Sequence, residues 1–75
     1  MAWKKYDEYE IFKRLFENPF KKDRFLIFIE GDRRLADIFI HDHGFGVVLH
    51  VDVHGIDYMG TAPKPTHYMT LPEDP

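Results

Sequence analysis

The 75-residue chain contains no cysteine. This excludes disulfide frameworks, thiolate zinc sites and cysteine nucleophiles. No apolar run approaches the roughly 20 residues that cross a bilayer, and no signal-peptide pattern opens the chain. We therefore expect a cytoplasmic protein that does not bind membranes.

A strong excess of charge of one sign is also missing. Ten Lys and Arg against thirteen Asp and Glu give a net charge of −3, which makes a typical basic nucleic-acid binder unexpected. The charge is unevenly placed: residues 1–34 carry nine basic and seven acidic groups, whereas residues 35–75 carry one basic and six acidic groups. A hydrophobic content of 44% nevertheless predicts a folded chain, and this length suits a single domain.

A helix is predicted to begin at Asp7, because Asp7 and Glu10 have the spacing of a capping box. Asn18 precedes Pro19, which disfavours helical geometry and should end the helix there. Between these limits, apolar residues recur at helical spacing and form one stripe: Ile11, Phe12, Leu15 and Phe16.

Three later segments have the character of strands. Residues 25–29 are apolar throughout, as in a strand that is covered on both faces, and residues 47–54 alternate between apolar and polar. With residues 35–41 they form an antiparallel meander whose turns are expected at Gly31-Asp32 and His43-Gly44. Residues 56–61 are a candidate for a short fourth strand.

The predicted fold is therefore α+β. An N-terminal amphipathic helix packs on one face of a three- to four-stranded antiparallel meander. Residues 1–61 form the domain, and residues 62–75 form an extended Pro-rich C-terminal tail.

Alternation along the strands assigns each side chain to one of two faces. The face under the helix should hold Phe25, Ile27, Ile29, Ala36, Ile38, Ile40, Val47, Leu49, Val51 and Val53. The opposite face should hold an apolar group, Leu26, Phe28, Leu35, Phe39 and Val48, beside a polar strip of Asp37, His41, His50, Asp52 and His54. In the predicted register Asp37 lies directly across from His50.

The polar strip has two chemical interpretations. His50, Asp52 and His54, with Asp37 opposite, are residue types that ligate Zn or another divalent metal. The His50–Asp52 segment also resembles, in part, the His-containing strands of two-histidine phosphoesterases, but the second motif of that family is missing. A metal-binding domain is thus the alternative, followed by a phosphoester-processing or nucleic-acid-binding domain.

The apolar group of the same face favours a different function. Exposed apolar patches of this kind usually mark interfaces. The C-terminal tail, a second copy of the chain or another protein are the three candidates to cover it. We expect a non-enzymatic protein-interaction module without a cofactor, a regulator or inhibitor that occupies a partner's surface. Its contacts would be Phe28, Leu35, Phe39 and Val48, with Asp37, His50 and Asp52 tuning specificity.

Overall fold

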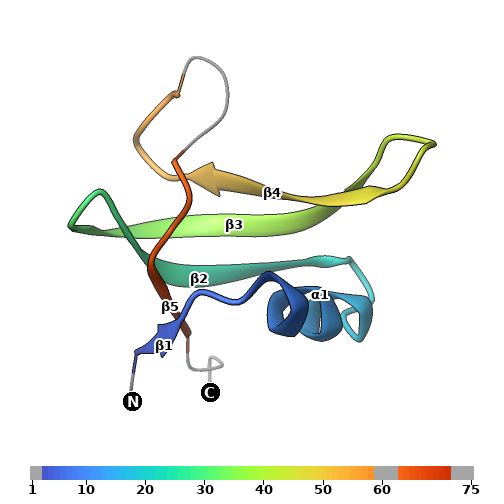
Figure 1. Cartoon of the computed structure of the whole chain (residues 1–75), viewed down its shortest axis with the longest axis horizontal. Coiled ribbons are helices and arrows are strands. Elements are labelled where there is room, and N and C mark those ends of the chain that lie inside the picture. The colour runs from blue at the N-terminus through green and yellow to red at the C-terminus, as the bar shows by residue number, and fades with distance from the viewer. Residues whose placement is uncertain (1–2, 59–62, 72–75) are drawn as a thin grey trace.

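One short helix and five strands make up the part of the chain that the computed structural model describes, residues 3–58 and 63–71. The elements are β1 (Lys4–Lys5), α1 (Glu8–Phe16), β2 (Lys22–Ile29), β3 (Asp32–Asp42), β4 (Val47–Val53) and β5 (His67–Thr70). The strands form one antiparallel sheet in the order β1-β5-β2-β3-β4, with β4 at one edge and β1 at the other (Figure 1).

The helix is capped at its N-terminus and held on the sheet by two buried side chains. The Asp7 carboxylate accepts hydrogen bonds from the N–H groups of Tyr9, at 3.0 Å, and Glu10, at 3.5 Å. Two buried side chains one turn apart, Ile11 and Leu15, anchor α1 on the sheet. No helix within residues 3–58 and 63–71 is long and apolar enough to cross a membrane.

The first hairpin turns at Glu30-Gly31 and not at Gly31-Asp32, so this prediction is wrong. Ile29 pairs with Asp32, and the two residues between them have positive φ values of 51° and 81°. A two-residue turn with both φ values positive matches the right-handed twist of the flanking strands. The register moves by two residues, so every side chain keeps its predicted face.

The second hairpin has a longer loop than predicted. Asp42 pairs with Val47, and the loop between them is closed by a 3.0 Å hydrogen bond from the His43 N–H to the Gly46 carbonyl. Gly44 and Gly46 both have positive φ, at 85° and 157°, which accommodates this wider turn. The predicted tight turn at His43-Gly44 is therefore wrong, again by a two-residue shift in register.

This shift changes the partners across the β3–β4 ladder. Asp37 lies directly across from Asp52, and His50 lies across from Phe39. The predicted Asp37–His50 pair is wrong. The faces themselves are unchanged, because a shift of two residues preserves the alternation of side chains.

The sheet is not a simple meander, because a strand lies within the range predicted to be a tail. Strand β5 runs antiparallel to β2, with Tyr68 opposite Ile27. Since β2 is apolar on both faces, a neighbour on each side suits it better than an edge position. A 2.9 Å hydrogen bond from the Thr66 N–H to the Phe28 carbonyl continues this pairing.

Some expectations at the C-terminal end concern residues that are only partly described. Residues 56–58 form no strand, and the rest of the expected strand, residues 59–61, lies outside the described residues. The same is true of residue 62 and residues 72–75 in the predicted tail.

The core lies between α1 and one face of the sheet, which carries the predicted apolar set. Val47 departs from this set, because it lies at the end of an edge strand and is 43% exposed. Tyr68, from the segment predicted to be a tail, adds an aromatic ring beside Phe25. The buried hydrophobic residues that form this core are Ile11, Leu15, Phe25, Ile27, Ile29, Ala36, Ile38, Val53 and Tyr68.

Candidate interaction surface

The side of the sheet opposite α1, here called the outer face, carries the residues singled out as partner contacts. The pairings Leu26–Leu35, Asp37–Asp52 and Phe39–His50 each join side chains that point to this side. The structure places all seven predicted contact residues on it: Phe28, Leu35, Asp37, Phe39, Val48, His50 and Asp52.

An apolar cluster occupies the half of the outer face formed by β1, β5, β2 and the start of β3. Leu26 lies at its centre, directly between Leu35 on β3 and Met69 on β5. Trp3 meets Phe28 edge-on, with ring centroids 4.9 Å apart. These five side chains, Trp3, Leu26, Phe28, Leu35 and Met69, are half-buried, and we call them the apolar cluster.

Basic side chains border the apolar cluster. Arg33 lies directly across from Phe28 on the same face. On the other side of Phe28 is His67, whose ring centroid is 6.3 Å from that of Phe28, and Lys5 lies across from His67. Arg33, His67 and Lys5 are all exposed. Arg33 and Lys5 therefore place two cationic groups beside the cluster.

The middle of the outer face holds a compact polar network around Asp37. One carboxylate oxygen, Oδ1, accepts a 3.1 Å hydrogen bond from Nε of Arg24, and the other, Oδ2, lies 3.0 Å from Nε2 of His54. Partial burial by itself raises the pKa of Asp37. The hydrogen bonds and positive charges of His54 and Arg24 outweigh that effect and lower this pKa below its usual value. Asp37 therefore stays ionised although it lies directly across from Asp52.

The far half of the outer face, toward the β3–β4 loop, carries the remaining predicted residues. Phe39 lies against the His50 ring, with centroids 4.7 Å apart and planes inclined by 34°. Val48 is 43% exposed, and His41 packs edge-on against His43 at 4.6 Å. Phe39 and Val48 are thus separate from the apolar cluster that contains Phe28 and Leu35.

The four predicted metal ligands do not converge on one point. His54 and Asp37 are within hydrogen-bond distance, but Arg24 takes the second oxygen of Asp37, and His50 lies against Phe39. Across residues 3–58 and 63–71, no group of three or more His, Asp or Glu side chains is placed to hold a metal ion.

Four outer-face residues were missed because they belong to segments outside the predicted sheet: Trp3, Lys5, His67 and Met69. The alternation of His67, Tyr68, Met69 and Thr70 was the available signal, since it places Tyr68 inward and His67 and Met69 outward. The sequence left folding of the C-terminal tail over the outer face as one possibility. Strand β5 of this tail does not lie over that face. It joins the sheet edge to edge and widens that face.

No model of a known protein family matches this chain, and neither a curated protein nor a solved structure is found that matches it. What the outer face does is therefore inferred from its own residues and their geometry.

Proposed function

We propose that this protein is a non-enzymatic interaction module, a small regulator or inhibitor, that binds another protein through its outer face. One observation carries the proposal: α1 covers only one side of the sheet, and the apolar cluster on the other side is only half-buried. Contiguous apolar surface bordered by polar residues is typical of protein–protein contacts.

The charges around the cluster indicate the chemistry of the partner. Lys5 and Arg33 border the cluster, whereas the Asp37 carboxylate is already engaged by Arg24 and His54. A complementary surface would be an apolar contact bordered by Asp or Glu side chains. Trp and Arg are also the residue types that most often dominate binding energy at such interfaces.

The chemistry of the outer face favours binding over catalysis. Its side chains provide apolar area, aromatic rings and ion pairs, and the sequence contains neither Ser nor Cys as a nucleophile. The absence of cysteine also suits a reducing compartment, and we propose that the interaction takes place in the cytoplasm.

The test is a double substitution on the outer face, Phe28→Ala with Phe39→Ala. The wild-type protein is first used to capture a partner protein, which is then purified. We expect the purified partner to bind the wild type saturably. The double variant should lose more than about tenfold in affinity while keeping the circular dichroism of the wild type. Phe20→Ala is the matched control, because Phe20 lies between α1 and β2 and is 85% exposed.

Three outcomes would count against this function or against the residues assigned to it. Equal affinity of the wild type and the double variant would show that the outer face is not the contact. Loss of binding after nuclease treatment, together with a steep dependence on salt, would instead indicate a nucleic-acid ligand. If the double variant unfolds, Phe28 and Phe39 serve the fold, and their assignment as partner contacts is wrong.

A further inference from the structure

The loop between β3 and β4 presents an aromatic side chain to solvent. Phe45 is fully exposed and lies between Gly44 and Gly46. Two hydrogen bonds hold the loop: the His43 N–H donates to the Gly46 carbonyl at 3.0 Å, and the Asp42 carboxylate accepts from the Gly44 N–H at 2.7 Å. In Figure 1 this loop extends past the other elements on its side of the molecule. Phe45 is therefore a protruding side chain on a closed loop.

An apolar hollow of about 570 Å³ lies next to this loop, between α1 and the first residue of β4. Three aromatic side chains of α1 form one wall, Tyr9, Phe12 and Phe16, and Val47 forms the other. Tyr9 and Phe16 are 73% and 52% exposed, so the hollow is open to solvent. Since Val47 comes only two residues after Phe45, the protruding ring and the hollow are neighbours.

Exposed apolar residues are concentrated at this corner of the molecule. Tyr9, Phe16, Phe45 and Val47 are four of the six large hydrophobic residues found exposed in the described structure. Single exposed apolar residues are ordinary, whereas a contiguous group of them usually marks a contact.

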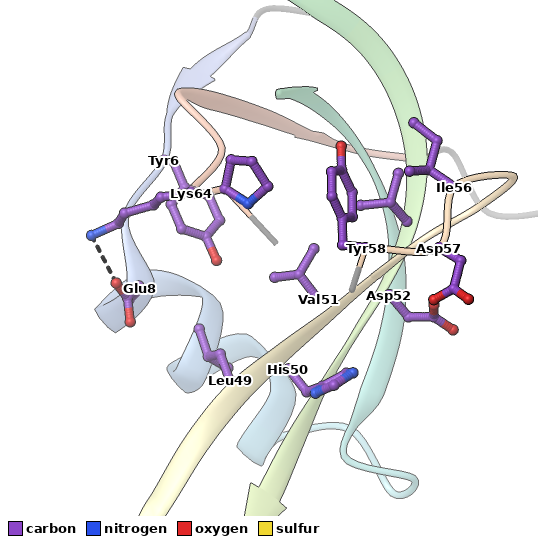
Figure 2. Close-up of a pocket in the computed structure, with 12 residues that line it drawn as sticks. Tyr6, Glu8, Leu49, His50, Val51, Asp52, Ile56, Asp57, Tyr58 and Lys64 are labelled. Carbon is purple, nitrogen blue, oxygen red and sulfur yellow. Dashed lines mark ion pairs between the residues drawn. The ribbon is translucent and has the colours of Figure 1, made fainter. Parts of the chain in front are cut away.

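The other end of β4 is occupied by the chain itself. Val53 is 3% exposed, and a second hollow, of about 530 Å³, runs along residues 49–53. Figure 2 shows that Tyr58 is among its walls and that the ion pair between Lys64 and Glu8, 2.8 Å long, lies on one side of it. The start of β4 is therefore the more accessible end of this strand.

We propose that the apolar hollow between α1 and Val47 is the binding site for Phe45 of a second copy of the chain. A twofold axis between the loop and the hollow relates the two copies, so that each inserts its Phe45 into the hollow of the other. Because the ring and the hollow are neighbours, one axis makes both contacts at once. Phe12 and Phe16, whose rings stack with centroids 6.1 Å apart, offer the inserted ring an aromatic wall.

The charges beside the two contact elements favour an identical partner. Lys13 and Glu17 of α1 border the hollow, and Asp42 and His43 precede Phe45 in its loop. Insertion of the loop brings Asp42 toward a surface with Lys13, and His43 toward a surface with Glu17, so each copy carries both halves of the match. All four side chains are exposed, and the inserted rings therefore supply most of the affinity.

The size of the contact predicts a reversible dimer. A buried Phe side chain removes about 150–250 Å² from water. With a similar area from each hollow, two such contacts bury about 600–1,000 Å² in total, less than the roughly 1,200 Å² at which stable interfaces begin. We therefore expect a dimer that dissociates on dilution.

This dimer goes beyond the proposed function and does not depend on it. Its contacts are α1, the start of β4 and the loop before it, whereas the proposed function uses the apolar cluster of the outer face.

The first test is the oligomeric state of the untagged full chain by analytical ultracentrifugation, at concentrations up to about 1 mM. Phe45→Ala should raise the dissociation constant of the dimer more than about tenfold. Its circular dichroism should remain that of the wild type, because Phe45 is fully exposed. Phe20→Ala is the matched control, since Phe20 is another exposed phenylalanine and does not line the hollow. It should leave the dimer unchanged.

A mixing experiment tests whether Phe45 enters the hollow. Tyr9→Glu replaces an aromatic wall by a carboxylate, which the first turn of a helix tolerates, and should prevent dimerisation by itself. A mixture of ¹⁵N-labelled Phe45→Ala with unlabelled Tyr9→Glu keeps one intact hollow and one intact ring. We expect the amide signals of Phe12 and Phe16 to shift in this mixture. Neither variant should show such shifts when it is mixed only with itself.

Three results would overturn the proposal: a monomer at every concentration up to about 1 mM, a dimer that survives Phe45→Ala, or a mixture that shows no shifts at the hollow. A dimer that Phe28→Ala with Phe39→Ala abolishes, but Phe45→Ala does not, would place the contact on the outer face. Failure of the proposed function is a separate observation, since it appears as unchanged partner binding in the outer-face variant.

Discussion

The Oδ2 atom of Asp37, in the middle of β3, lies 3.0 Å from Nε2 of His54, just after the end of β4. The other oxygen of the same carboxylate accepts a hydrogen bond from Arg24 on β2. One side chain therefore connects three neighbouring strands on the outer face. The Asp37 side chain is 15% exposed, whereas the side chains of Arg24 and His54 are 54% and 38% exposed, so only the carboxylate itself is largely shielded from water.

The Asp37 network predicts a specific loss of stability in acid. The folded state lowers the pKa of Asp37, so the contribution of its carboxylate is fully present above the ordinary Asp pKa, about 4. It is lost as the pH falls through the lower folded-state value. The free energies of unfolding of the wild type and Asp37→Asn should differ most near neutral pH and converge in acid. Urea unfolding across this pH range measures both.

The control for this prediction is Asp57→Asn, a change at an exposed carboxylate. Its difference from the wild type should vary less with pH. A gap between wild type and Asp37→Asn that stays constant from neutral pH into acid would show that Asp37 contributes through packing and not through its charge.

Strand β5 predicts that two adjacent residues have unequal effects on stability. Tyr68 is 6% exposed and packs edge-on against Phe25 and Tyr6, at centroid distances of 5.9 Å and 6.2 Å. Tyr68→Ala should cost about 3–5 kcal/mol, as for other buried aromatic residues, and so most of the stability of a small chain. Thermal unfolding followed by circular dichroism measures this loss.

Met69→Ala is the matched control, because Met69 lies on the outer face and is half-buried. It should cost about 1 kcal/mol. If both variants unfold at the wild-type temperature, residues 67–70 contribute no packing, and the sheet ends at β2.

The N-terminus of α1 supplies a third prediction. Asp7 accepts hydrogen bonds from two N–H groups of the first helical turn, so Asp7→Ala should lower the free energy of unfolding by about 1 kcal/mol. Asp7→Asn keeps an acceptor oxygen and should lose much less. Chemical denaturation of the three proteins checks the order. Equal stability of the alanine variant and the wild type would show that this cap contributes nothing.

Much of the sheet was predictable because its signals are local. The alternation of residues 47–54 and the apolar run of residues 25–29 assigned side chains to faces correctly, even though both turns were misplaced. In each hairpin the predicted register was wrong by two residues. Because side chains along a strand return to the same face every two residues, this error left the faces unchanged. Pairs across the strands were not predictable in this way, since they depend on loop length. The Asp37–His50 pair failed for that reason.

The candidate surface was predictable only in part. Alternation sufficed to place Phe28, Leu35 and Asp37 on one face. It could not show that Trp3 and Met69 join them, because these residues arrive from segments near opposite ends of the chain. The contacts of Asp37 with Arg24 and His54 likewise require three strands in their final register.

By itself the sequence determined which residues are apolar, where a helix can begin and which side of each strand faces inward, because propensity and periodicity act between near neighbours. The tertiary structure decided that the C-terminal segment supplies a strand, that β2 lies inside the sheet and that β4 is left at an edge. These outcomes depend on backbone hydrogen bonds between distant segments, such as the one from Thr66 to Phe28. No pattern of near neighbours encodes such a bond, because any strand offers the same N–H and C=O groups to any other.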